Sequence, residues 1–262
     1  MLIKVLKVFI IYWNKYSGVR KMLVFKRILR DLPKLRRYLQ DLKSFQSLGG
    51  NVDKWSIHLH EDGDFAGDAS GHYFWQDLVV AQWVLTQKKN LVADIGSRLD
   101  GYVSHVASSQ KVFVIDIRPI KKAIPNVEFI KDDILNYKSK KRFEIVTSLH
   151  TLEHIGLGRY GDPIDPIGHI KSFSALAKMT LPKGQLVVSF PIDSQTRVEF
   201  NGQRMVGYQE PLKWAKENNL KFVKFICLRS DDDLVYCKSI SSLAKFSVEP
   251  GALGIYFFKK MS

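Results

Sequence analysis

Two histidines in the segment 148–162, which reads SLHTLEHIGLGRYGD, are the side chains best suited to proton transfer. An imidazole is poised to gain or lose a proton near neutral pH, so it can take the proton that a nucleophilic hydroxyl loses. His150 directly follows an apolar run and is the first candidate base, and His154 shares its face if the segment is helical. Glu153 is placed to orient either ring, and Asp162 is a third candidate catalytic group. A structural role for His154, as a buttress beside a ligand loop, is an equal alternative.

Candidate substrate contacts come from two loops. In GLGRYGD, glycines bound a loop that can close over a bound molecule, and the planar guanidinium of Arg159 can grip a carboxylate or phosphate. Pairing of Arg159 with Asp162 or Asp165 is the structural alternative. The segment 197–204 (RVEFNGQR) is expected to form a hairpin or lid beside the substrate. The four substrate-binding candidates are Arg159, Tyr160, Asn201 and Arg204.

Acidic and small residues follow several apolar runs. The stretch 91–101 (LVADIGSRLDG) reads as a strand and a glycine turn, and a helical pattern follows it. This order begins a nucleotide-binding α/β unit, although an ordinary strand-to-helix turn has the same pattern. Asp116 lies roughly 20 residues after the acid of the turn, as a ribose-binding carboxylate would. The candidate cofactor-binding residues are Asp94, Gly96, Ser97, Arg98, Gly101, Asp116, Asp133, Ile134 and Ser148.

The glycine turn does not favour a dinucleotide. A nicotinamide-binding turn carries three glycines, whereas this one has only Gly96 and Gly101, with Arg98 and Asp100 among them. An acid at Asp94 would repel a pyrophosphate and suits the zwitterionic end of S-adenosylmethionine. The acids at the strand ends therefore favour S-adenosylmethionine over a nicotinamide cofactor.

The elements that must position these side chains alternate between strand and helix. Seven apolar runs predict strands, at 91–95, 111–116, 127–130, 143–149, 185–190, 220–228 and 254–258. Helices are expected at 72–86, 167–180 and 211–218. This alternation is typical of an α/β fold with a doubly wound sheet.

The positive charge is concentrated near the amino terminus. The formal net charge is +14, and residues 1–43 contain 12 Lys or Arg and only 2 Asp. Residues 1–46 read as a basic amphipathic helical extension that Pro33 breaks or restarts, and residues 47–262 as the α/β domain. Such helices bind anionic membrane surfaces, although an arm packed on its own domain or on a second subunit fits the pattern too. A nucleic-acid partner is not expected, because the body of the chain carries little net charge.

Neither a metal site nor a disulfide framework is indicated. The acids and histidines of residues 53–68 do not match a calcium loop, and residues 150–169 do not demand a metal. The only two cysteines, Cys227 and Cys237, lie in apolar contexts and fit a reducing compartment. No run at the amino terminus is long enough to span a bilayer.

The order of these motifs resembles that of the class I S-adenosylmethionine-dependent methyltransferases, including the phrase PKGQLVVSFP at 182–191. Several runs resemble more closely a bacterial family of unknown function that is associated with surface-polysaccharide genes. They are GHYFWQD (71–77), DIGSRLDG (94–101), DIRP (116–119), SLHTLEHIGLGRYGDPIDPIG (148–168) and RVEFNGQR (197–204). The resemblance implies a seven-stranded Rossmann-like methyltransferase fold with S-adenosylmethionine as cofactor.

These observations predict O-methylation of a sugar in a surface glycan or a lipid-linked precursor, by a cytoplasmic protein held at the inner membrane surface by its basic arm. The asparagine–proline–proline–tyrosine signature of amino-group methylation is missing after the fourth strand. The alternative is a non-catalytic binding or scaffold protein in polysaccharide biosynthesis, which the incomplete glycine turn favours. The sequence names neither the acceptor nor the oligomeric state.

Overall fold

The computed structural model of the chain describes residues 19–60, 66–137 and 141–262, and the chain divides after Asp68 into two compact units. In the first unit, α2 (Val19–Ser47) is one helix. The predicted break at Pro33 is wrong, because proline removes a single backbone N–H and the hydrogen bonds on either side maintain the helix. The first 18 residues of the predicted extension lie outside the described residues. Among the helices described, none is long and apolar enough to cross a membrane.

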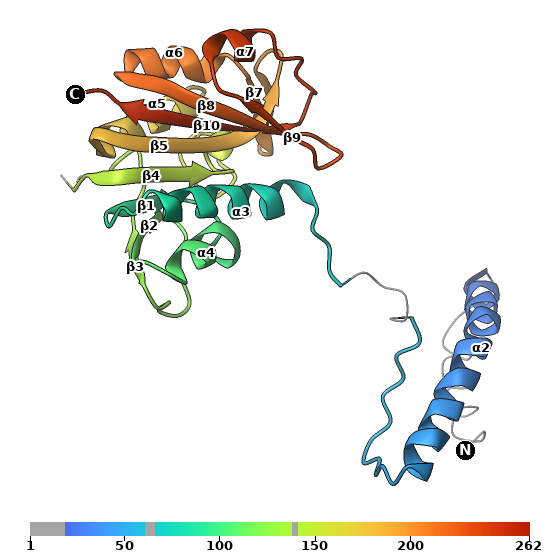
Figure 1. Cartoon of the computed structure of the whole chain (residues 1–262). Coiled ribbons are helices and arrows are strands. Elements are labelled where there is room, and N and C mark those ends of the chain that lie inside the picture. The colour runs from blue at the N-terminus through green and yellow to red at the C-terminus, as the bar shows by residue number, and fades with distance from the viewer. Residues whose placement is uncertain (1–18, 61–65, 138–140) are drawn as a thin grey trace. The chain divides into compact units, whose positions relative to one another are not determined.

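The second unit is built on a mixed sheet in the order β3-β2-β1-β4-β5-β10-β8-β9 (Figure 1). The neighbours from β3 to β5 are parallel, and β10, β8 and β9 continue the sheet in antiparallel pairs. The parallel strands are β1 (Val92–Ile95), β2 (Val112–Asp116), β3 (Val127–Lys131), β4 (Phe143–Leu149) and β5 (Thr180–Asp193). The others are β8 (Leu220–Leu228), β9 (Leu234–Cys237) and β10 (Leu253–Lys260). All seven predicted strands are therefore confirmed.

A hairpin of β6 (Arg197–Glu199) and β7 (Gln203–Gly207) follows β5 and confirms the hairpin expected at 197–204. Strand β7 pairs with the end of β5. Because β5 follows β4 in the sheet, the hairpin lies near the carboxyl end of β4, where the candidate histidines begin.

Helices cover both faces of the sheet, as a doubly wound fold requires (Figure 1). On one face lie α3 (Gly71–Thr86), the irregular turn η1 (Leu99–Val103) and α4 (Ser104–Ala107). On the other lie α5 (Gly168–Met179), α6 (Glu210–Glu217) and α7 (Ile240–Ala244). Neighbouring strand residues alternate between the two cores, since Val92 packs in the first and Ala93 in the second. Both cysteines are buried and free, as packing residues.

The parallel pairing decides where the chemistry lies. Strands β1, β2 and β4 run in the same direction, so Ile95, Asp116 and Leu149 end at one edge of the sheet. A turn follows each strand there, and η2 (Leu152–His154) is a single helical turn after β4. Ligands of such sheets bind outside this edge.

Candidate active site

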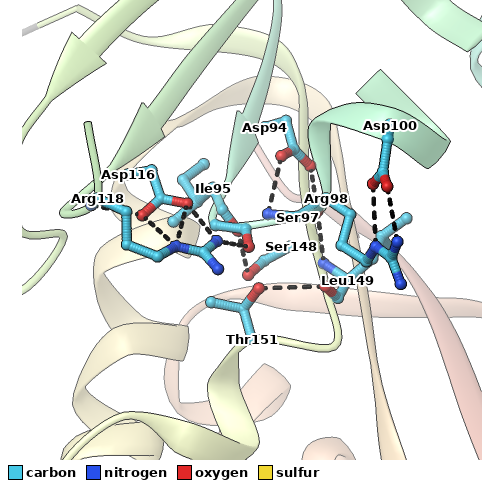
Figure 2. Close-up of polar contacts among 11 residues, drawn as sticks. Asp94, Ile95, Ser97, Arg98, Asp100, Asp116, Arg118, Ser148, Leu149 and Thr151 are labelled. Atoms are coloured by element: carbon cyan, nitrogen blue, oxygen red, sulfur yellow. Dashed lines mark hydrogen bonds and ion pairs between the residues drawn. The ribbon is translucent and has the colours of Figure 1, made fainter. Parts of the chain in front are cut away.

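The turn after β1 brings the backbone close to the loop after β4. Gly96 has a φ of +73°, and a Cβ at this position would clash with the side chain of Thr151. Glycine is the residue that meets both conditions without strain. The backbone N–H and the hydroxyl of Ser97 donate to Asp94 at 3.1 and 2.6 Å (Figure 2). The predicted glycine turn is thus present, and it closes on the acid that precedes it.

Asp94 is fully buried beneath this turn. Its carboxyl group also accepts a hydrogen bond of 2.7 Å from Thr147. Burial raises the pKa of Asp94 to about 7, while the hydrogen bonds from Ser97 and Thr147 act in the opposite direction. The predicted contact of Asp94 with a cofactor is wrong, because the side chain has no exposed surface. Ser97 and Ser148 are buried as well. The Ser148 hydroxyl donates to the Ile95 carbonyl, so both serines stabilise the turn from its buried side.

A cavity opens outside the ends of β1, β2 and β4. Eight of the predicted site residues line it: Gly96, Asp116, Asp133, Ile134, His150, His154, Tyr160 and Asp162. Much of the remaining wall is aliphatic, from Ile95, Ile115, Ile117, Leu135 and Ile155. The fold therefore brings together residues from four separate segments that sequence reasoning assigned to one site.

Asp116 is paired with Arg118 in the wall of this cavity. The guanidinium of Arg118 donates from Nε to both carboxyl oxygens of Asp116, at 3.0 and 3.1 Å, and from Nη2 to the Gly96 carbonyl at 3.1 Å (Figure 2). It also lies 5.2 Å from the centre of the Tyr160 ring. The hydrogen bond to Asp116 raises the pKa of Arg118 further above its ordinary value. Arg118 thus bonds to the carboxylate of Asp116, which was predicted to bind ribose.

Asp133 and Ile134 form the wall beyond β3. The carboxyl oxygens of Asp133 accept hydrogen bonds from the backbone of Leu135 and the amide of Asn136, at 2.9 and 3.0 Å. The side chain of Ile134 is almost fully buried against the core and forms part of the cavity wall. Asp133 therefore holds the turn that presents Ile134 to the cavity.

His150 and Glu153 form a buried hydrogen-bonded pair. His150 Nδ1 lies 2.7 Å from Glu153 Oε1, and the two side chains are 7% and 0% exposed. Because a carboxylate oxygen accepts, Nδ1 is the donor of this pair, and in the neutral imidazole Nε2 then keeps its lone pair. Nε2 is buried without a hydrogen-bond partner in the described structure. His150 also has a φ of 50°, a conformation that costs a non-glycine residue roughly 1–3 kcal/mol and that clusters at functional sites.

His154 is fixed by two other groups. Its Nδ1 donates to the Gly202 carbonyl at 2.8 Å, and its Nε2 lies 3.7 Å from Glu153 Oε1. The carboxyl group of Glu153 is therefore shared between two imidazoles, of which His150 is much the closer. This geometry favours the structural alternative for His154, since its ring ties η2 to the turn of the β6–β7 hairpin.

A second cavity adjoins the same histidines. It shares His150, His154 and Tyr160 with the first cavity and adds His72 and Tyr73 from α3. Other contributions come from Arg159, Pro191, Gln203, Met205 and Gly251. The rings of Tyr73 and His150 lie 4.8 Å apart, so α3 packs directly against the candidate base.

Asp162, a predicted catalytic group, closes a loop of the chain. Asp162 accepts hydrogen bonds from the backbone N–H groups of Gly156, Gly158 and Tyr160. Burial alone would raise the pKa of Asp162, but these hydrogen bonds hold it below its ordinary value. The catalytic role predicted for Asp162 is therefore replaced by closure of the GLGRYGD loop.

Arg204 is buried, so its predicted contact with substrate is wrong. Its guanidinium donates to main-chain carbonyls of the segment 153–166, the shortest bond being 2.6 Å to Ile155. Arg204 therefore clamps this segment onto the hairpin. Asn201 is exposed at the hairpin turn with a φ of 60°, a position that suits asparagine, and it lines neither cavity.

Arg98 and Gly101 lie outside both cavities, so their predicted cofactor contacts are not supported. Arg98 forms an exposed ion pair of 2.7 Å with Asp100 (Figure 2). Gly101 leaves room for the carboxyl group of Asp77 from α3, which a Cβ would strike. The second half of the predicted glycine turn thus serves helix packing.

Sequence reasoning missed Arg118 and the aromatic face of α3. The run GHYFWQD, which carries His72 and Tyr73, was recognised only as part of a resemblance and a helix. Glu153 was considered as an orienting group, and its spacing of three residues from His150 was the available signal. Among the described residues, no cluster of His, Cys, Asp or Glu could hold a metal ion.

Comparison with solved structures identifies the fold. The N-methyltransferase NodS from Bradyrhizobium japonicum WM9 superposes with a TM-score of 0.51 at 14% identity, over 72% of this chain and 97% of NodS. The complex of NodS with S-adenosyl-L-homocysteine gives a TM-score of 0.50 at 14% identity, over 72% of this chain and 88% of that one. The chain has the class I methyltransferase fold.

The other comparisons are less specific. Residues 109–210 match a family described as "Caenorhabditis protein of unknown function, DUF268". A search of the curated proteins finds no match. The methyltransferase fold is thus established, and the association with surface polysaccharides stays a prediction.

The first cavity fits the adenosyl cofactor of this fold in two respects. Its aliphatic wall, including Ile134 and Ile117, suits an adenine ring, and the turn at Gly96 allows close approach to the backbone. Asp116 has the acceptor atoms that ribose hydroxyls need, but Arg118 competes for them. The residues therefore fit the cofactor once Arg118 shares or releases Asp116.

Proposed function

We propose that the protein is an S-adenosylmethionine-dependent methyltransferase that methylates a sugar hydroxyl of a surface glycan or a lipid-linked precursor. The observation that carries this proposal is His150, a residue of both cavity walls whose Nδ1 is bonded to Glu153 and whose buried Nε2 has no hydrogen-bond partner among the described residues. A hydroxyl group loses a proton when its oxygen becomes methylated, so this reaction needs such a base.

The cofactor-facing residues are Gly96, Asp116, Asp133 and Ile134, all of which line the first cavity. When bound, S-adenosylmethionine supplies an electrophilic methyl group on a sulfonium centre. The apolar wall excludes water from this side. Asp116 would accept hydrogen bonds from the ribose, and Ile134 would cover the adenine ring.

His150 performs the proton transfer. Its Nε2 would accept the proton that the acceptor hydroxyl loses on methylation, for which S-adenosylmethionine would supply the methyl group. The imidazole then carries a positive charge, which the carboxyl group of Glu153 stabilises at 2.7 Å. Since Glu153 is buried, water weakens this interaction little.

Binding and turnover test the proposal separately. Calorimetry with S-adenosylmethionine checks the cofactor site. Transfer of labelled methyl from S-adenosylmethionine to a panel of glycans checks the reaction. His150→Ala should abolish transfer and leave cofactor binding intact, whereas His105→Ala, which alters an exposed histidine on α4, should change neither. Transfer that survives His150→Ala would refute the assignment of the base.

The pairing of Arg118 with Asp116 favours a second candidate, a binding or scaffold protein that keeps the fold without turnover. In that case the arginine would permanently block the ribose site. Absence of S-adenosylmethionine binding by the wild type, with binding gained by Arg118→Ala, would support this candidate over the enzyme.

We also propose that residues 1–43 hold the protein at an anionic membrane surface, on the cytoplasmic side, where lipid-linked precursors are assembled. The support is the excess of ten positive charges in this segment, since each basic residue near an anionic surface contributes about 1 kcal/mol. Sedimentation with phosphatidylserine vesicles should show binding by the full chain and none by residues 44–262. Equal sedimentation of the two proteins would refute the role of the segment.

A further inference from the structure

Arg159 differs from the two other exposed arginines near the candidate active site, Arg98 and Arg118. Arg98 is paired with Asp100, and Arg118 with Asp116. Arg159 has no carboxylate partner in the described part of the chain. Its Nη1 donates to the Gly202 carbonyl at 3.0 Å, and the rest of its exposed guanidinium has no hydrogen-bond acceptor among these residues. The pairing with Asp162 or Asp165 that the sequence left open does not occur, because those carboxyl groups bond the loop backbone and Lys171.

The position of Arg159 is fixed relative to the base. Gly202 accepts from both Arg159 and His154, and Arg159 Nη1 lies 3.4 Å from His154 Nδ1. Glu153 then links His154 to His150. The cation and the free Nε2 of His150 thus belong to one connected cluster, and both residues line the second cavity. A molecule in this cavity can present a hydroxyl to His150 and a second group to Arg159.

The surroundings suit a ring that bears charge. Tyr73 and Tyr160 are each more than two fifths exposed beside the cavity, and the guanidinium of Arg159 lies 5.4 Å from the Tyr160 ring centre. Exposed aromatic faces provide an apolar surface for a sugar ring, while a free guanidinium fork matches a carboxylate or phosphate. Glu153, the acid of this cluster, is buried and bonded to His150, and it forms no ion pair with Arg159 in the described structure.

We propose that Arg159 binds an anionic group, a carboxylate or a phosphate, on the sugar that accepts the methyl group. This inference rests on the proposed function and narrows the acceptor to acidic sugars such as uronic acids or sugar phosphates. Arg159 acts in recognition, and the proton still leaves through His150.

Met205 offers a direct readout, because its side chain lines the same cavity. The full chain is labelled with methyl-13C methionine in the presence of S-adenosyl-L-homocysteine, and the Met205 signal is assigned with Met205→Leu. Glucuronate, glucose 6-phosphate and glucose are titrated at constant ionic strength, so the arms compare a carboxylate, a phosphate and a neutral sugar. We expect an anionic sugar to shift the Met205 signal at roughly ten- to a hundredfold lower concentration than glucose, as a charge-assisted hydrogen bond implies.

Three variants make the test specific. Arg159→Gln should remove the preference for the anionic sugars, and Arg159→Lys should retain part of it because the charge remains. Arg142→Gln, which removes an exposed positive charge just before β4, should keep the full preference. Equal responses to the three sugars, no response at their solubility limit, or a preference that survives Arg159→Gln would each overturn the proposal.

Calorimetry on the same sample separates this inference from the proposed function. Cofactor binding without an anion preference refutes the role of Arg159 alone. An anion preference that depends on Arg159, without binding of S-adenosylmethionine or its demethylated product, supports the site and refutes the methyltransferase activity.

Discussion

Replacement of Arg118 should strengthen cofactor binding, because this arginine competes for the carboxylate that ribose would use. Both oxygens of Asp116 accept from Arg118 Nε. The guanidinium is 46% exposed, so solvent weakens the ion pair, which is then worth about 0.2–1 kcal/mol. Arg118→Ala should therefore raise the affinity for S-adenosyl-L-homocysteine by about 1.4- to fivefold. Added salt should reduce the difference from wild type, since it screens the pair.

The reverse change tests the other half of the pair. Asp116 is only 11% exposed, and loss of a charged hydrogen-bond acceptor costs about 1.5–3 kcal/mol. Asp116→Asn should therefore weaken binding by roughly ten- to 150-fold, and Arg118→Ala should add little in this background. Arg98→Ala is the matched control, because it breaks an arginine–aspartate pair of the same spacing outside the cavity. Calorimetry of the four variants gives the answer. A tenfold or greater loss of affinity in Arg118→Ala would show that Arg118 holds the ligand and would refute the competition.

Three other changes follow from the same geometry. Gly96→Ala should lower the free energy of unfolding by about 1–2 kcal/mol because of the positive φ, and further because the new Cβ clashes with Thr151. Gly161 also has a positive φ but open space around it, so Gly161→Ala should show only the first effect. Thermal unfolding compares the two variants. The raised pKa of Asp94 means that its charged form is disfavoured in the fold, so stability should fall as pH rises from about 4 to 7, and Asp94→Asn should flatten this slope in denaturant titrations at several pH values. Glu153→Gln should lower kcat about 10²- to 10⁴-fold and leave cofactor affinity unchanged, because the imidazole of His150 loses the charge that orients it. An unchanged kcat in the methyl-transfer assay would contradict the role of this pair.

Local sequence patterns were sufficient for most of the elements, though not for β9 and α7, and for the edge of the sheet that carries the chemistry. Each strand is a short apolar run, and parallel pairing places the ends of such runs together. For that reason Asp116, Ile134 and His150 could be assigned to one site without knowledge of the sheet order. Their grouping depends only on each residue lying at or just beyond the carboxyl end of a strand.

The errors concern polar residues whose partners are distant in the sequence. Asp94 was predicted to contact a ligand, but its carboxyl group accepts a hydrogen bond from Thr147 of β4. Arg204 was assigned to substrate, yet carbonyls of the segment 153–166 surround it. Nothing in the neighbouring residues distinguishes a buried clamp from an exposed contact, since burial depends on which loop packs over the side chain. Arg118 was missed because an arginine two residues after an acid is ordinary on a surface.

The wall shared by the two cavities supports transfer more strongly than the fold does. A protein that only binds a ligand needs one cavity, whereas an in-line transfer needs a donor site and an acceptor site with the base at their boundary. His150 is at that boundary because β4 ends there, with the first cavity toward β1 and β2 and the second toward α3 and the β6–β7 hairpin. The backbone strain at His150 and the burial of Glu153 are costs that a scaffold has no reason to bear. They are accounted for if the imidazole must present one free nitrogen between two bound molecules.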